Sequence, residues 1–70
     1  MQIDLTSDEA LVLFDLLSRW DDSERFEVGD PAERRVLWNL LADLERRLAE
    51  PFAPDYASLL DAARARVRDA

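Results

Sequence analysis

Carboxylates are almost the only side chains of this chain that could take part in chemistry. Asp and Glu account for 16 of its 70 residues, and it contains no histidine and no cysteine. Its nine basic residues are all arginines, so the usual general base, the thiol nucleophile and the Schiff-base amine are missing. A single glycine also excludes the glycine-rich loops that cradle phosphates. We therefore expect no catalytic residue and no cofactor.

The densest group of carboxylates falls in residues 21–30, DDSERFEVGD, where a metal site deserves consideration. Hard cations prefer oxygen ligands, but a calcium loop of the EF-hand type needs acids at alternate positions and a glycine at the sixth. The segment does not match this spacing, so the sequence predicts a solvated acidic loop without a bound metal. Four of its acids are instead candidate contacts for a protein partner: Asp21, Asp22, Glu24 and Glu27.

Trp38 is the residue on which a binding function could depend. It falls on the flank of a helical pattern, about 100° from the centre of the apolar face. Such a tryptophan either packs against a neighbouring helix or the acidic loop, or it is exposed and anchors an interface. Val36, on the opposite flank, raises the same question. So do Leu11 and Val12, which fall near the polar side of another helical pattern.

The net charge of −7 is concentrated in the first half of the chain. Residues 1–33 hold ten acids and two arginines, a net charge of −8, and residues 34–70 hold six acids and seven arginines, a net charge of +1. An acidic half disfavours contact with nucleic-acid phosphates and attraction to anionic lipid, so we expect neither direct nucleic-acid binding nor membrane binding. It suits a basic protein partner, although solubility alone would also explain it.

Helices must position these residues. The strongest helical pattern in the sequence falls at residues 30–50. Asp30 can cap a helix over residues 31–50, Pro31 suits its first turn, and Glu33 occupies the capping-box position. Because this helix lies between two others in the chain, we expect it to contact both of them.

Two further helical patterns flank it, at about residues 7–20 and 54–68. Weak alternation of apolar and polar residues at 2–5 and 25–28 leaves open a short β pairing of these segments. Together the patterns predict an all-α fold, a compact three-helix bundle that forms a single domain over residues 1–70.

The predicted core consists of the apolar residues that recur on one face of each pattern. They are Leu13, Phe14, Leu17 and Trp20 in the first, Leu37, Leu40, Leu41, Leu44 and Leu48 in the second, and Tyr56, Leu59, Leu60, Ala63 and Val67 in the third. Asp15, Ser18 and Arg19 lie opposite the apolar face of the first pattern, where we expect them to meet solvent.

Two segments resemble small acidic all-helical bacterial proteins of an uncharacterised type: LTSDEALVLFDLLSRW at Leu5–Trp20, and ERRVLWNLLADLE followed by PDYASLLDAARARV within Glu33–Val67. The resemblance lies in the core pattern, so it implies a compact helical domain from a bacterial source and carries over no functional residue. Small acidic helical proteins include nuclease-inhibiting immunity proteins and antitoxins, but no motif here identifies either.

We interpret the chain as a cytoplasmic, non-catalytic protein–protein interaction module whose partner is a second copy or a basic protein. Two alternatives remain open. An inhibitor or immunity-type protein that mimics nucleic acid and blocks a basic groove requires its acids to form a phosphate-like stripe. A carboxylate- or metal-dependent enzyme requires a concave site with converging acids.

Overall fold

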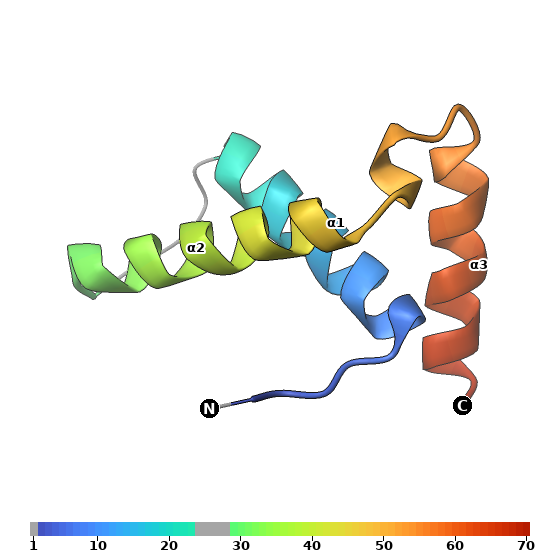
Figure 1. Cartoon of the computed structure of the whole chain (residues 1–70), viewed down its shortest axis with the longest axis horizontal. Helices are drawn as coiled ribbons and strands as arrows, with labels where there is room; N and C mark the ends of the chain where they lie inside the picture. The colour runs from blue at the N-terminus through green and yellow to red at the C-terminus, as the bar shows by residue number, and fades with distance from the viewer. Residues whose placement is uncertain (1, 24–28) are drawn as a thin grey trace.

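Three α-helices and one short 3-10 helix make up the structure, a computed structural model that describes residues 2–23 and 29–70 (Figure 1). The elements are α1 (Ser7–Ser23), α2 (Pro31–Arg47), η1 (Glu50–Phe52) and α3 (Tyr56–Arg68). The predicted all-α, three-helix bundle is confirmed, and the described residues contain no strand. Residues 2–5 therefore form no β pairing in the described part of the chain, and residues 25–28 lie outside it.

Side-chain caps fix where α1 and α2 begin. Thr6 Oγ1 accepts a hydrogen bond from the Glu9 amide at 3.1 Å, and Glu9 Oε1 accepts one from the Thr6 amide at 2.9 Å, which completes a capping box. The Thr6 amide and then the Thr6 hydroxyl hold the pKa of the Glu9 carboxyl below its usual value. At α2, Asp30 is the N-cap, and Glu33 reaches back to the Gly29 amide at 2.7 Å rather than to the N-cap amide.

The observed helix ends differ from the predicted ones at three places. α1 continues to Ser23, three residues further than expected. α2 stops at Arg47 because Leu48 has an extended backbone (φ −103°, ψ 135°), which turns the chain and leaves Leu48 buried. α3 begins at Tyr56, after a turn at residues 54–55.

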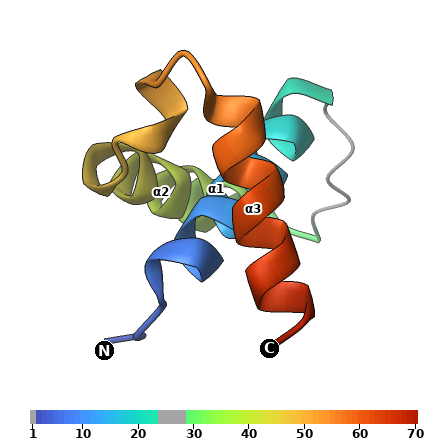
Figure 2. The same cartoon turned by 90° about the vertical axis from the view of Figure 1, so that its right-hand side faces the viewer.

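α1, and not α2, is the central helix of the bundle. It packs extensively against both other helices, whereas α2 and α3 contact each other little within the described residues. Figures 1 and 2 show α3 running across one end of the pair formed by α1 and α2, beside the first half of α1. The expectation that the helix beginning at Pro31 would contact both others was wrong, because η1 separates α2 from α3 and packs against α3 itself.

Among the residues that the structure describes, seven are buried and form the core, with contributions from all three helices. They are Leu11, Phe14 and Leu17 of α1, Leu44 of α2, Leu48 directly after α2, and Leu60 and Ala63 of α3. Partly buried side chains packed against them include Leu13, Leu37, Leu41 and Tyr56. Leu59 is also partly buried. Most of the predicted core is therefore confirmed.

Four placements differ from the prediction. Leu11, expected near the polar side, is 4% exposed and belongs to the core. Trp20, Leu40 and Val67, expected in the core, are 41%, 37% and 38% exposed. For two of them the cause is the position of α3. Leu11 lies on the flank of α1 that bears Asp8 and Asp15, which both contact α3. Figure 1 shows α3 beside the first half of α1 and not beside its second half, to which Trp20 belongs.

Asp15, expected to meet solvent, joins α1 to α3. Its Oδ1 accepts a hydrogen bond from the Tyr56 hydroxyl at 3.0 Å, and its Oδ2 accepts bonds from Arg64 Nη2 at 2.9 Å and Arg19 Nε at 2.8 Å. The Asp15 side chain is only 13% exposed, so its charge needs these partners. Burial, followed by the hydrogen bond to Asp15, raises the pKa of Tyr56 to about 12.

A second polar contact joins the first turn of α1 to the last turn of α3. Arg66 donates from Nε and Nη2 to the two carboxylate oxygens of Asp8, at 2.8 Å each. These hydrogen bonds lower the pKa of Asp8 and raise the pKa of Arg66. Because the pair is open to solvent, we assign it a role in fixing the direction of α3 rather than a large share of stability.

Replacing Leu11 by alanine should lower the free energy of unfolding by about 2–5 kcal/mol, because it empties part of a closely packed site. Val36→Ala is the matched control: Val36 is 64% exposed, so its loss should change stability by about 0.5 kcal/mol or less. Urea unfolding followed by circular dichroism measures both values. Equal stabilities of the two variants would contradict the burial of Leu11.

Tyr56 is the one tyrosine of the chain, so ultraviolet absorbance follows its ionisation alone. The folded protein should titrate at about 12, and the urea-unfolded chain at about 10. Because folding raises this pKa, the stabilisation it reflects is complete below a pH of about 10 and is lost as the pH rises through the folded-state value. Asp15→Asn should lower the folded-state pKa, and Asp43→Asn on α2 should not. Titration of the wild-type tyrosine at its unfolded value, with helical circular dichroism intact, would refute the Tyr56–Asp15 contact.

Candidate functional site

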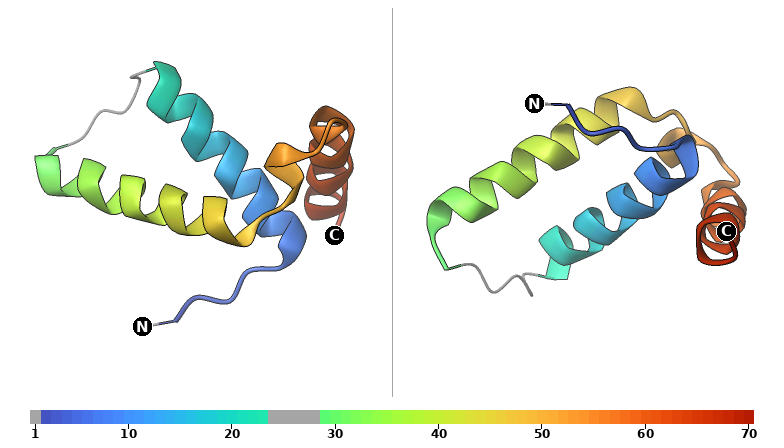
Figure 3. Two further views of the ribbon diagram at one scale, coloured as in Figure 1. Left: turned by 45° about the horizontal axis from the view of Figure 1, so that its top comes forward. Right: turned by 90° about the horizontal axis from the view of Figure 1, so that it is seen from below.

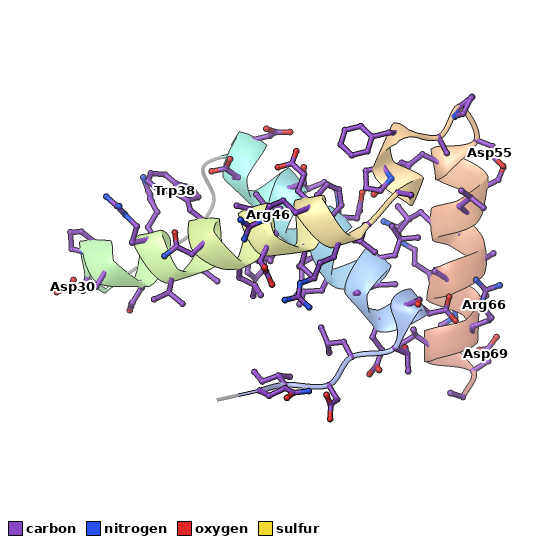
Figure 4. The ribbon with its side chains drawn as sticks, in the orientation of Figure 1. Asp30, Trp38, Arg46, Asp55, Arg66 and Asp69 are labelled. Carbon is purple, nitrogen blue, oxygen red and sulfur yellow. The ribbon has the colours of Figure 1, made fainter. Side chains whose placement is uncertain are left out.

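Trp38 is a surface residue of α2 that is fixed to α1. Its indole Nε1 donates a hydrogen bond to Asp21 Oδ1 at 2.8 Å, while 44% of the residue remains exposed. Asp21 lies in the last turn of α1, at the end where Figure 3 shows α1 and α2 farther apart. Figure 4 shows the Trp38 side chain projecting from α2 on the side of that turn. The ring is therefore both exposed and held in place, which combines the two states that the sequence left open.

Arg34 covers one face of the Trp38 ring. Its guanidinium carbon lies 5.9 Å from the ring centroid, within the range of a cation–π interaction. Arg35 is exposed beside it. Both arginines and Trp38 line one open hollow, together with residues 29–31 at the start of α2. We call the surface formed by Asp21, Arg34, Arg35 and Trp38 the Trp38 surface.

The two arginines of the Trp38 surface differ from the other arginines that the structure describes. Ion pairs with carboxylates engage Arg19, Arg46, Arg47, Arg64, Arg66 and Arg68. Neither Arg34 nor Arg35 makes an ion pair with a described residue, and neither does the exposed Asp22. A chain with a net charge of −7 thus carries, next to its exposed tryptophan, two arginines that no described carboxylate pairs with, one of which lies over the Trp38 ring.

The structure brings together only some of the predicted contact residues. Asp21 and Trp38 are joined by a hydrogen bond. Asp22 is exposed on the flank of α1 that bears Asp15, and Val36 is exposed on the opposite flank of α2 from Trp38.

Two other candidates are buried wholly or in part, which leaves little of either side chain for contact with a partner. Leu11 is buried in the core, so its choice as a candidate contact was wrong, and Val12 is partly buried against the same core. The last two candidates, Glu24 and Glu27, lie outside the described residues.

Three further apolar side chains are exposed that the sequence did not single out as contacts. Phe52 in η1 is 73% exposed, and Ile3 and Leu5, which precede α1, are 70% and 41% exposed. None of the three lines the hollow beside Trp38. Single exposed apolar residues are common on soluble domains, so we assign them no role.

The described residues offer little to catalysis or metal binding. They contain no group of three or more side chains placed to hold a metal ion. Tyr56, Asp15 and Arg64 do converge, but the pKa of Tyr56 is raised to about 12, the opposite of what a base or nucleophile near neutral pH requires. Their arrangement is that of a contact between helices. Among the described helices, none has the length and apolar character needed to cross a membrane.

Sequence reasoning missed the arginines of the Trp38 surface although one signal was available. Arg34 precedes Trp38 by four residues, a spacing that places the two side chains next to each other on a helix. The contact between Trp38 and Asp21 had no such local signal, because it depends on how α1 and α2 are placed relative to each other.

Removing the carboxylate of Asp21 should release the Trp38 indole. In a proton–nitrogen correlation spectrum, Asp21→Ala should move the Trp38 indole N–H resonance upfield, because a hydrogen bond to a carboxylate deshields the proton. Trp38→Phe assigns the resonance, and Asp61→Ala on α3 is the control that should leave it unchanged. An unmoved Trp38 resonance in Asp21→Ala would contradict the contact.

Comparison of the chain with models of known protein families, with curated proteins and with solved structures found no match. The resemblance to small acidic helical bacterial proteins therefore stays a prediction from the core pattern. Any role for the Trp38 surface has to be argued from its own residues.

Proposed function

We propose that this chain is a non-catalytic protein–protein interaction module whose contact surface is centred on Trp38. The observation that carries the proposal is a tryptophan that is 44% exposed and yet fixed by Asp21 and Arg34. Tryptophan and arginine are the residues most enriched among those that dominate binding energy. A side chain already held in one orientation loses less conformational entropy when a partner binds.

The partner in this proposal is a protein, either a second copy of the chain or a basic protein. Support comes from the net charge of −8 in residues 1–33, which favours encounter with positive surfaces. The same charge is unfavourable for nucleic acid and for anionic lipid. A cytoplasmic location completes the proposal and rests on the lack of cysteine, since disulfides accompany oxidising compartments.

The two alternative functions draw less support. Mimicry of nucleic acid needs a row of free carboxylates, but Asp8 and Asp15 on α1 are each paired with an arginine of α3, Arg66 and Arg64. A carboxylate-dependent enzyme needs acids that converge in a cleft. The hollow beside Trp38 is lined by a single acid, Asp30, which caps α2.

Site-specific photocrosslinking in the cells that make this chain tests the proposal. A photoreactive residue at Ala42, exposed on α2 one turn beyond Trp38, should give a discrete crosslinked species. The same residue at Ser58, exposed on α3, is the matched control and should not give that species.

Introducing Trp38→Ala into the Ala42 probe should abolish the species, provided that circular dichroism shows the helices intact. Identical crosslinks from the two probe positions, or crosslinks at Ala42 that persist without Trp38, would rule the proposal out.

A further inference from the structure

One side of the first turns of α2 forms an open hollow. Pro31, Arg34, Arg35 and Trp38 recur at i, i+3, i+4 and i+7, so they share one side of the helix. All four line the hollow, together with residues 29 and 30. Its volume is about 380 Å³, at the small end of the range for ligand sites. A few side chains of a partner are enough to fill it.

The arginines of this hollow have N–H donors that no described residue uses. Neither Arg34 nor Arg35 makes an ion pair or a side-chain hydrogen bond with a described residue. The contact of Arg34 with the Trp38 ring leaves these donors available, because a guanidinium carries five of them around its planar edge. Among protein side chains, a carboxylate is the group that matches this planar fork.

The acids next to the arginines already have partners. Asp30, which lines the hollow, accepts a hydrogen bond from the Ala32 amide at 2.8 Å. Asp21 accepts one from the Trp38 indole. Their negative charges limit how much further negative charge the surface attracts. A carboxylate brings one such charge, whereas a phosphate group brings up to about two and a nucleic-acid strand brings a row of them. The surroundings therefore favour a carboxylate.

We propose that the Trp38 surface binds an acidic segment of its protein partner, with a carboxylate on Arg34 and Arg35 and an apolar side chain on the exposed part of the Trp38 ring. The inference rests on the proposed function and names the part of the partner that makes the close contact. The overall charge of the partner is a separate property, because it acts over a longer distance. A basic protein and a second copy of this chain can each supply such a segment.

The apolar side chain is needed because an ion pair in water contributes little to affinity by itself. Trp38 is 44% exposed, so an apolar side chain packed on its ring removes apolar surface from water and shields the ion pair beside it. The segment that fits this surface therefore carries an acidic and an apolar side chain as neighbours.

A blocked tripeptide, acetyl-Leu-Glu-Leu-amide, contains this combination and no other charge. Added to the full chain up to about 20 mM, it should shift the Trp38 indole N–H resonance and the amide resonances of residues 32–38 until they saturate, with a dissociation constant in the millimolar range. Acetyl-Leu-Gln-Leu-amide is the matched control, because it has the same shape without the charge. It should bind about tenfold more weakly.

Charge-neutral variants test whether the arginines bind the carboxylate. Arg34→Gln and Arg35→Gln should each weaken binding of the glutamate peptide by about fivefold or more, with the helices intact by circular dichroism. Arg68→Gln, at an exposed position of α3, is the matched control and should bind the peptide as the wild type does. Trp38→Ala, followed at the amides of residues 32–37, should weaken binding of both peptides.

Three results would overturn the inference. Equal shifts from the two peptides, or shifts that do not saturate with the glutamate peptide, mean that the arginines bind no carboxylate. Equal weakening by Arg35→Gln and Arg68→Gln means that the peptide responds only to overall charge. The same shifts from inorganic phosphate at about a tenth of the peptide concentration identify a phosphate-bearing ligand instead.

The proposed function can stand without this inference, and the Ala42 probe separates the two. Crosslinks from Ala42 that require Trp38 but persist when Arg34→Gln and Arg35→Gln are combined would keep the interaction module and remove the acidic segment. Loss of these crosslinks in the combined variant, with the Arg68→Gln control unaffected, is the result expected if a partner's carboxylate binds the two arginines.

Discussion

The fold depends on burying one helix from two sides. Leu11, Phe14 and Leu17 of α1 are the buried residues that face the other elements, and α1 packs against both α2 and α3. A chain of 70 residues has little interior. A single shared helix gives both α2 and α3 an apolar face to pack against. α2 and α3 can then diverge, because neither needs the other to cover its apolar face. The flank of α2 that carries Trp38 stays partly open to solvent.

Polar contacts set the direction of α3 once α1 has provided the apolar contact. Asp15 and Asp8 lie about two turns apart on α1, and each accepts hydrogen bonds from an arginine of α3. Because the two contacts lie at different positions along the helices, together they fix the angle of α3 relative to α1 and its register along α1. Apolar packing alone is less directional, so these acids specify an arrangement more than they stabilise it.

Local patterns were enough to predict the helices, the cap at Asp30 and most of the core, because apolar periodicity and capping depend on residues near in sequence. They were not enough to predict which helix is central. That depends on where η1 directs the chain after Leu48, and the leucine pattern continues through this position without a break. The burial of Leu11 and the contacts of Asp15 with α3 followed from the same unknown, since α3 covers a flank of α1 that looks polar in the sequence. The candidate site was predicted in part: Trp38 was singled out, but its bond to Asp21 joins residues 17 apart in the chain and required the fold.

The hydrogen bond between Trp38 and Asp21 has a thermodynamic consequence for the molecule. It crosses from the last turn of α1 to Trp38, near the middle of α2. A ligand that binds the indole in its bonded orientation therefore also favours the closed pair of helices. Binding at this surface and folding of the helical hairpin draw on one shared contact, so a gain in either is a gain in both. Sequence changes that loosen the hairpin will weaken recognition even when they lie far from any partner.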